Sequence, residues 1–221
     1  MKIHTAIIAL TAVLFIAPVF TDHNRTDEQG WKQGHWTEFP GDGLLAAEGE
    51  YVDDKKHGQW VLQYDSGAES KGPFMSGKKH GHWVFRGDSY TAEGQYVNGK
   101  KHGHWVEWSN SSGVEEGQYV NGSKHGEWVQ RLVDGRVGGG QYVNGKKRGH
   151  WVEWWGEGSH VNEGHYVDGK RHGRWVIRFD YPNGYVGKGP YVGGKKHGLW
   201  IERSANGEER KVNYRNGEKV K

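Results

Sequence analysis

The chain has 221 residues, of which 33% are hydrophobic, 13% aromatic and 26% charged, and its formal net charge is +3. It holds 37 glycines and 12 tryptophans but no cysteine, which excludes a disulfide framework, a cysteine-based zinc site and a thiol nucleophile. The near balance of charge gives no indication of nucleic-acid binding, so we expect no nucleic-acid partner.

The N-terminus has the pattern of a targeting segment. Lys2 precedes an apolar run that reaches Phe20 and then stops at the polar residues Thr21 and Asp22. This run is shorter than the roughly 20 apolar residues that a membrane-spanning helix needs. The pattern predicts a secretory signal peptide over residues 1–21, with an uncleaved signal anchor as the alternative. We therefore expect an exported protein (periplasmic, envelope-associated or secreted), with residues 22–33 as a flexible lead-in.

Residues 34–221 repeat one short motif about eight times. Tryptophans that follow a glycine by two positions recur at intervals of 22–25 residues, at Trp36, Trp60, Trp83, Trp105, Trp128, Trp151, Trp175 and Trp200. A second block, GQYVNGKKHG from Gly94, recurs with small changes ahead of the tryptophans. Self-similarity at such a period indicates a repeat architecture.

Each copy contains two runs typical of β-strands, for example residues 94–98 and 104–108. Residues 99–103 between them are predicted to form a hairpin loop, because Asn-Gly favours such a turn. The sequence therefore predicts an all-β fold, an elongated single-layer array of stacked antiparallel β-hairpins. Strands of about 5 residues and an advance of about 10 Å per repeat would make a narrow rod. The pattern does not settle which face carries the tryptophans and which the valines.

The pattern G-x-Y-x-x-G-x-x-x-G, its period and its K-K-H-G loop resemble MORN repeats (membrane occupation and recognition nexus), and most closely the bacterial MORN-variant proteins. The resemblance covers about residues 34–221, and Phe74, Ser123 and Arg148 depart from it without breaking the frame. It implies stacked hairpins that form an elongated, slightly twisted groove. It also implies an interaction module or a lipid-associating module, and some bacterial relatives are labelled antitoxin components.

The Lys-Lys-His loops predict a basic stripe along one long edge of the rod. It could attract an acidic partner or an anionic surface. The alternative, which we slightly favour, is that lysines fill exposed turns and discourage association. The candidate partner-binding residues are Lys55, Lys56, Lys78, Lys79, Lys100, Lys101, Lys124, Lys146, Lys147, Arg148, Lys170, Arg171, Lys195 and Lys196.

Aromatic residues form the second candidate surface, either as a buried spine or as a groove that stacks on sugars. We favour the spine for the repeated tryptophans and leave the exposure of Trp108, Trp154 and Trp155 open. The candidate residues are Tyr51, Trp60, Trp83, Tyr96, Trp105, Trp108, Tyr119, Trp128, Tyr142, Trp151, Trp154, Trp155, Tyr166, Trp175, Tyr191 and Trp200.

The sequence holds no G-x-S-x-G, no H-E-x-x-H and no phosphate-binding glycine motif. Loop histidines about 10 Å apart cannot share one zinc ion, whose ligands lie within about 2.1 Å. We therefore expect no metal, no cofactor and no enzymatic activity. The sequence predicts an exported module that binds an extended partner, first of all a protein-interaction scaffold of the cell envelope. The alternatives are a binder of membrane surfaces or anionic lipid through the lysine edge, a glycan binder through exposed tryptophans, and an antitoxin-like component.

Overall fold

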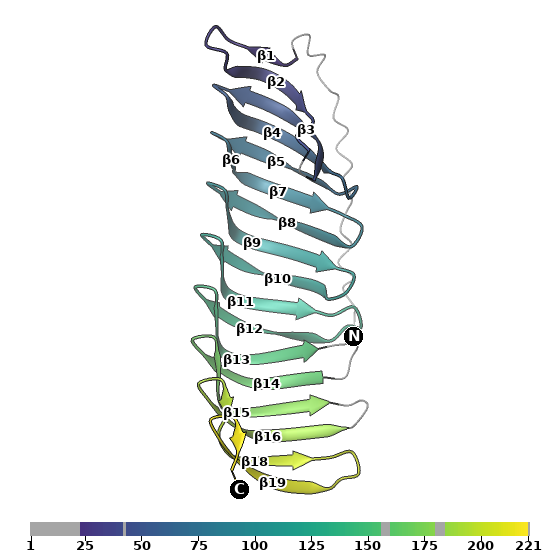
Figure 1. Cartoon of the computed structure of the whole chain (residues 1–221), viewed down its shortest axis with the longest axis vertical. Helices are drawn as coiled ribbons and strands as arrows, with labels where there is room; N and C mark the ends of the chain where they lie inside the picture. Colours follow the sequence, from purple (N-terminus) through teal and green to yellow (C-terminus); the bar gives the residue numbers. More distant parts are fainter. Residues whose placement is uncertain (1–22, 42, 156–159, 180–183, 221) are drawn as a thin grey trace, which may run out of the picture.

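The computed structural model describes residues 23–41, 43–155, 160–179 and 184–220. One open antiparallel sheet of hairpins makes up this part of the chain (Figure 1), and the described ranges contain no helix. Strands account for 74% of the structure, so the predicted all-β hairpin array is confirmed. The predicted signal peptide at residues 1–21 lies outside the described residues and stays a prediction.

The strands follow one another in chain order along the long axis (Figure 1). They are β1 (Arg25–Thr26), β2 (Lys32–Glu38), β3 (Leu44–Val52), β4 (Lys55–Tyr64), β5 (Glu69–Met75), β6 (Lys78–Lys79), β7 (Gly81–Arg86), β8 (Tyr90–Val97), β9 (Lys100–Ser109), β10 (Gly113–Val120), β11 (Ser123–Arg131), β12 (Val137–Val143), β13 (Lys146–Trp155), β14 (His160–Val167), β15 (Lys170–Phe179), β16 (Tyr185–Val192), β17 (Lys195–Lys196), β18 (Gly198–Arg203), β19 (Glu209–Arg215) and β20 (Glu218–Lys219).

The array begins ahead of the first repeat motif. Arg25 and Thr26 pair antiparallel with Gln33 and Lys32, so β1 covers the edge of β2. The carboxylate of Asp27 closes the turn between them by accepting hydrogen bonds from two backbone N–H groups that follow it. Residues 22–33, expected to be a flexible lead-in, therefore include paired strand. Covering an edge in this way protects it from pairing with other chains.

The strands are longer than predicted, because most of the Lys-Lys-His-Gly segment is strand and not loop. In the β8–β9 hairpin the turn is only Asn98 and Gly99, with φ of 51° and 82°. Two successive positive φ values identify the tight hairpin turn that Asn-Gly favours. The predicted five-residue loop is therefore wrong. Its last part is a bulge, since Gly94 faces Trp105 while Gln95 faces His102.

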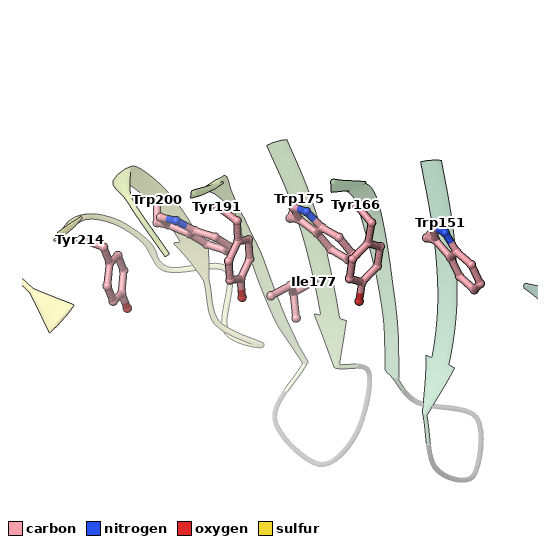
Figure 2. Packing of buried hydrophobic residues seen from close by; sticks show 7 residues of the cluster. All are labelled: Trp151, Tyr166, Trp175, Ile177, Tyr191, Trp200 and Tyr214. Atoms are coloured by element: carbon pink, nitrogen blue, oxygen red, sulfur yellow. The ribbon is translucent and has the colours of Figure 1, made fainter. Parts of the chain in front are cut away.

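One face of the sheet carries sixteen rings in a continuous row, the aromatic row, part of which is drawn in Figure 2. Neighbouring rings come from adjacent strands, and fifteen edge-to-face contacts with centroids 4.9–6.2 Å apart join them. Each such pair contributes about 0.5–1.5 kcal/mol beyond its buried area. The row consists of Trp36, Tyr51, Trp60, Phe74, Trp83, Tyr96, Trp105, Tyr119, Trp128, Tyr142, Trp151, Tyr166, Trp175, Tyr191, Trp200 and Tyr214.

Seven glycines on the strands ahead of the tryptophans make this packing fit. A Cβ added at Gly94 would lie 2.4 Å from the Trp105 ring, and one added at the equivalent glycine of any other copy would lie 2.4–2.7 Å from its tryptophan. The ring is also held in place, because Trp105 Nε1 donates a hydrogen bond to the carbonyl of Gln95 at 3.0 Å. The repeated tryptophans from Trp60 to Trp200 are at most 5% exposed, so they form the buried spine of the sheet.

We expect Gly94→Ala to destabilise the protein by about 1–3 kcal/mol, because the added methyl group overpacks a ring that cannot move aside. Urea denaturation measures the change, and Gln95→Ala, on the exposed side of the same strand, serves as the matched control. A denaturation midpoint for Gly94→Ala equal to that of the wild type would contradict the packing argument.

Candidate functional site

The two basic residues of each loop point to opposite sides, because consecutive side chains of a strand alternate. The first residue of each pair is exposed, and we call this set the outer lysines: Lys55, Lys78, Lys100, Lys146, Lys170 and Lys195. The second is half-buried, and with its counterpart in β2 this set forms the inner cations: Lys32, Lys56, Lys79, Lys101, Lys124, Lys147, Arg171 and Lys196. The predicted stripe on one edge is therefore two separate rows.

The inner cations lie over the aromatic row. Lys101 Nζ is 4.2 Å from the ring centroid of Trp105 in its own strand and 5.1 Å from that of Tyr119 in the next. The same placement recurs along the array, at 3.9–4.7 Å from the tryptophan and 4.8–5.9 Å from the following ring. A cation over a ring contributes about 0.5–2 kcal/mol. These cations thus cover the face of the sheet where a two-layer fold would place a second layer.

Seven of the eight inner cations have glutamate partners that the sequence did not predict. Lys101 pairs with Glu107, and Lys196 pairs with Glu202 at 3.4 Å. The other acids are Glu38, Glu115 and Glu153. Four of the five follow a repeated tryptophan by two residues. This spacing could have indicated that they lie on the face of the aromatic row, since residues two apart on a strand share a face.

Tyrosines of the aromatic row bind the same carboxylates. Tyr214 donates its hydroxyl to Glu202 at 2.9 Å. Burial and this hydrogen bond raise the pKa of Tyr214 to about 12. Burial alone would raise the pKa of Glu202, but the hydrogen bonds from Tyr214 and Tyr185 and the charge of Lys196 outweigh it and lower that pKa below 4.5. The buried carboxylate is therefore held in its charged form.

The outer lysines form a ridge whose spacing is set by the backbone. The turn glycine of each hairpin donates its N–H to the carbonyl of the preceding inner cation, as Gly122 does to Lys101 at 2.8 Å. The same bond recurs at Gly77, Gly99, Gly145, Gly169, Gly194 and Gly217, at 2.8–2.9 Å. Within the described part of the chain, no carboxylate pairs with an outer lysine. The ridge is thus a row of exposed ammonium groups carried by backbone positions of fixed spacing.

The residue that follows the two basic residues of each loop is exposed in some copies and half-buried in others. His57, Arg148, His172 and His197 are exposed beside the ridge. The other three loop histidines are half-buried, and their Nδ1 atoms have no hydrogen-bond partner: His80, His102 and His125. No group of three or more metal-ligating side chains occurs among the residues that the structure describes.

Two of the extra tryptophans, Trp108 and Trp154, are not part of the aromatic row. Trp108 is half-buried and faces Thr91 and Val114 of its neighbouring strands. Trp154 is half-buried, donates Nε1 to the carbonyl of Val137 at 3.1 Å and lies 4.6 Å from the guanidinium of Arg136. The side chain of Trp155 lies outside the described part of the structure.

A broad hollow on the described surface lies where β12 carries three successive glycines. It measures about 670 Å³, and its lining includes Glu115, Gln130, Lys147 and Glu153. Gly138 supplies no side chain at a position that most of the equivalent strands fill, for example with Ala92 in β8 and Asn162 in β14. The lining mixes both signs of charge and therefore indicates no single ligand class.

A scan against models of protein families finds none that matches this chain, and a search of curated proteins finds no similar sequence. The resemblance to MORN repeats is therefore carried by the motif alone and stays a prediction. No helix with the length and apolar character to cross a bilayer occurs among the described residues.

We expect Lys101→Met to lower the free energy of unfolding by about 1–2 kcal/mol, because it removes the charge over two rings and leaves Glu107 unpaired. Lys100→Met, the adjacent outer lysine, should change it by less than about 0.5 kcal/mol, as expected for an exposed side chain. Urea denaturation of both variants makes the comparison. Equal effects at the two positions would contradict the division into inner and outer rows.

We expect Glu202→Gln to cost about 1–2 kcal/mol at neutral pH. A carboxylate with a lowered pKa stabilises the fold above its ordinary pKa of 4.5, and this contribution disappears as the pH falls through the folded-state value. The difference between wild type and variant should therefore shrink below about pH 4.5. Denaturation curves at several pH values measure it, with the exposed Glu208→Gln as control. A difference that does not vary with pH would exclude this account.

Proposed function

We propose that the chain is a non-enzymatic module that binds an extended acidic protein segment along the ridge of outer lysines. One observation carries the proposal: the outer lysines are exposed, lack ion-pair partners among the described residues and recur at a spacing fixed by backbone hydrogen bonds. Such a module would act as an interaction scaffold. Its location at the cell envelope rests only on the predicted signal peptide.

The spacing of the ridge suits an extended chain. Neighbouring outer lysines are one two-strand repeat apart, about 10 Å, except where Ser123 takes the position between Lys100 and Lys146. An extended polypeptide advances about 3.3 Å per residue, so an acidic side chain at every third position would meet one lysine after another. A single exposed ion pair contributes only about 0.2–1 kcal/mol. Several such contacts on one rigid surface add up through multivalency, which is the usual advantage of a repeat array.

The alternatives have less support. A glycan stacked on the repeated tryptophans would have to displace the inner cations, because those rings are buried beneath them. An anionic membrane surface would be attracted by the same ridge, and binding to anionic vesicles distinguishes it from a protein partner. No feature of the described surface favours an antitoxin-like role over a general interaction module.

The test uses a synthetic peptide of about 18 residues with glutamate at every third position, long enough to span the ridge. Replacing Lys55, Lys100 and Lys170 with serine, the residue found naturally at position 123, should raise the Kd at least tenfold. Replacing all six outer lysines should abolish binding. The matched control removes the same charge elsewhere, by serine at the exposed Lys71, Lys188 and Lys211, and should leave the Kd nearly unchanged.

Binding should weaken as the salt concentration rises, because exposed charges are screened. Equal losses in the ridge and control variants would reject the ridge as the binding surface. Binding to vesicles containing phosphatidylserine without binding to the peptide would replace the protein partner with a membrane surface.

A further inference from the structure

One inner cation differs from the other seven. Lys79 has no carboxylate partner among the described residues, whereas each of the others pairs with a glutamate. The reason can be read along the repeat. Four inner cations pair with a glutamate six positions later, as Lys101 does with Glu107, and Lys124 pairs with Glu115 nine positions earlier. For Lys79 these two positions are occupied by Phe85 and Ser70.

A cavity lies where the missing carboxylate would be. It measures about 150 Å³, and its lining includes Lys79, Phe85, Tyr90, Ala92 and Lys101. At roughly 30 Å³ per water molecule, this is the volume of about five waters, enough for a short carboxylic acid. A third position supplies the acids of Lys56 and Arg171, from the preceding repeat, and for Lys79 this position is Leu62. None of the three positions therefore supplies a carboxylate here, and the cavity combines an ammonium group with mostly apolar walls.

The ammonium group of Lys79 is poorly compensated. Its Nζ lies 4.0 Å from the Trp83 ring centroid and 5.5 Å from that of Tyr96. Burial among these rings lowers the pKa of Lys79, and the neighbouring charge of Lys101 lowers it further. A half-buried cation without a counter-ion gains from any carboxylate that reaches it.

The second ammonium group of the cavity and the hydroxyl of Ser70 are already engaged. Lys101 pairs with Glu107, which also accepts a hydrogen bond from the Tyr119 hydroxyl at 3.3 Å. The hydroxyl of Ser70 shares a hydrogen bond with that of Tyr64 at 3.0 Å. An incoming anion would therefore meet Lys79 as the available cation.

We propose that the cavity at Lys79 is a binding site for a carboxylate that carries a short apolar chain. The carboxylate would pair with the ammonium group of Lys79, and the carbon chain would lie against Phe85 and Ala92. The group could be a free short-chain acid or the side chain of an acidic residue in a bound segment. Only the second source rests on the function proposed above, because the cavity lies on the face of the aromatic row and not on the ridge.

The experiment titrates the full chain with sodium butyrate and follows the indole N–H signals of Trp83 and Trp105 by NMR. In the wild type, we expect both signals to shift and to saturate at millimolar concentrations of butyrate. Butyramide, the uncharged analogue, should cause no shift. Lys79→Met should weaken binding at least tenfold. Lys100→Met, an outer lysine, should leave it unchanged.

A second pair of variants separates the effect of an added carboxylate from the effect of losing the Phe85 ring. Phe85→Glu places a carboxylate at the position equivalent to Glu107, the partner of Lys101. The new side chain should pair with Lys79, occupy the site and abolish butyrate binding. Phe85→Gln removes the same ring without adding charge and should retain binding. Both variants lose the ring contacts of Phe85 with Tyr64 and Tyr90, which makes them a matched pair.

The outcomes distinguish this site from the ridge. Shifts that persist in Lys79→Met or in Phe85→Glu, or that butyramide reproduces, would overturn the carboxylate site. Shifts with butyrate but no binding of the glutamate peptide would support a free acid as ligand and reject the proposed function alone. Loss of the peptide-induced shifts at Trp83 in Lys79→Met, with the peptide still bound to the ridge, would support the acidic side chain as the source.

Discussion

The packing of each tryptophan ring directly over a glycine of the adjacent strand is the constraint on which the rest of the structure depends. It constrains the register, because a side chain at the position that faces the ring would overlap it. It also sets the spacing of the rings, so that each repeated tryptophan from Trp60 to Trp200 meets a tyrosine or phenylalanine edge-to-face on both sides. A sheet with one layer thus obtains a buried interior from rings lying flat along its own surface.

The inner cations and their glutamates add to the stabilisation that the aromatic row provides. A half-buried ammonium group over two rings, neutralised by a glutamate that a tyrosine hydroxyl also binds, links neighbouring hairpins through three kinds of interaction. The alternation of the strand then leaves the other lysine of each pair free of this network. The first basic residue of each pair therefore presents a surface charge, and the second stabilises the fold.

The repeat, the hairpins and the elongated architecture could be predicted from the sequence, because the Gly-x-Trp and Asn-Gly signals recur at a fixed period. The strand length could not, since Lys100-Lys101-His102 resembles a polar loop until the two-residue turn and the bulge at Gly103 are known. Nor could the two roles of the lysines be separated, because that division depends on register. Nor could the exceptional position of Lys79 be predicted, because it depends on the structure giving each of the other inner cations a glutamate partner.

The glycine run of β12 has a consequence for how the chain reaches its folded state. The two clusters of buried side chains lie on either side of it, one from Ala47 to Trp83 and the other from Trp151 to Tyr214. Contacts in the array are local, so we expect folding to nucleate within either cluster and to spread inwards. The two folding fronts meet at the strand with the greatest backbone entropy to lose, which makes the junction near Gly138 the last segment to be completed.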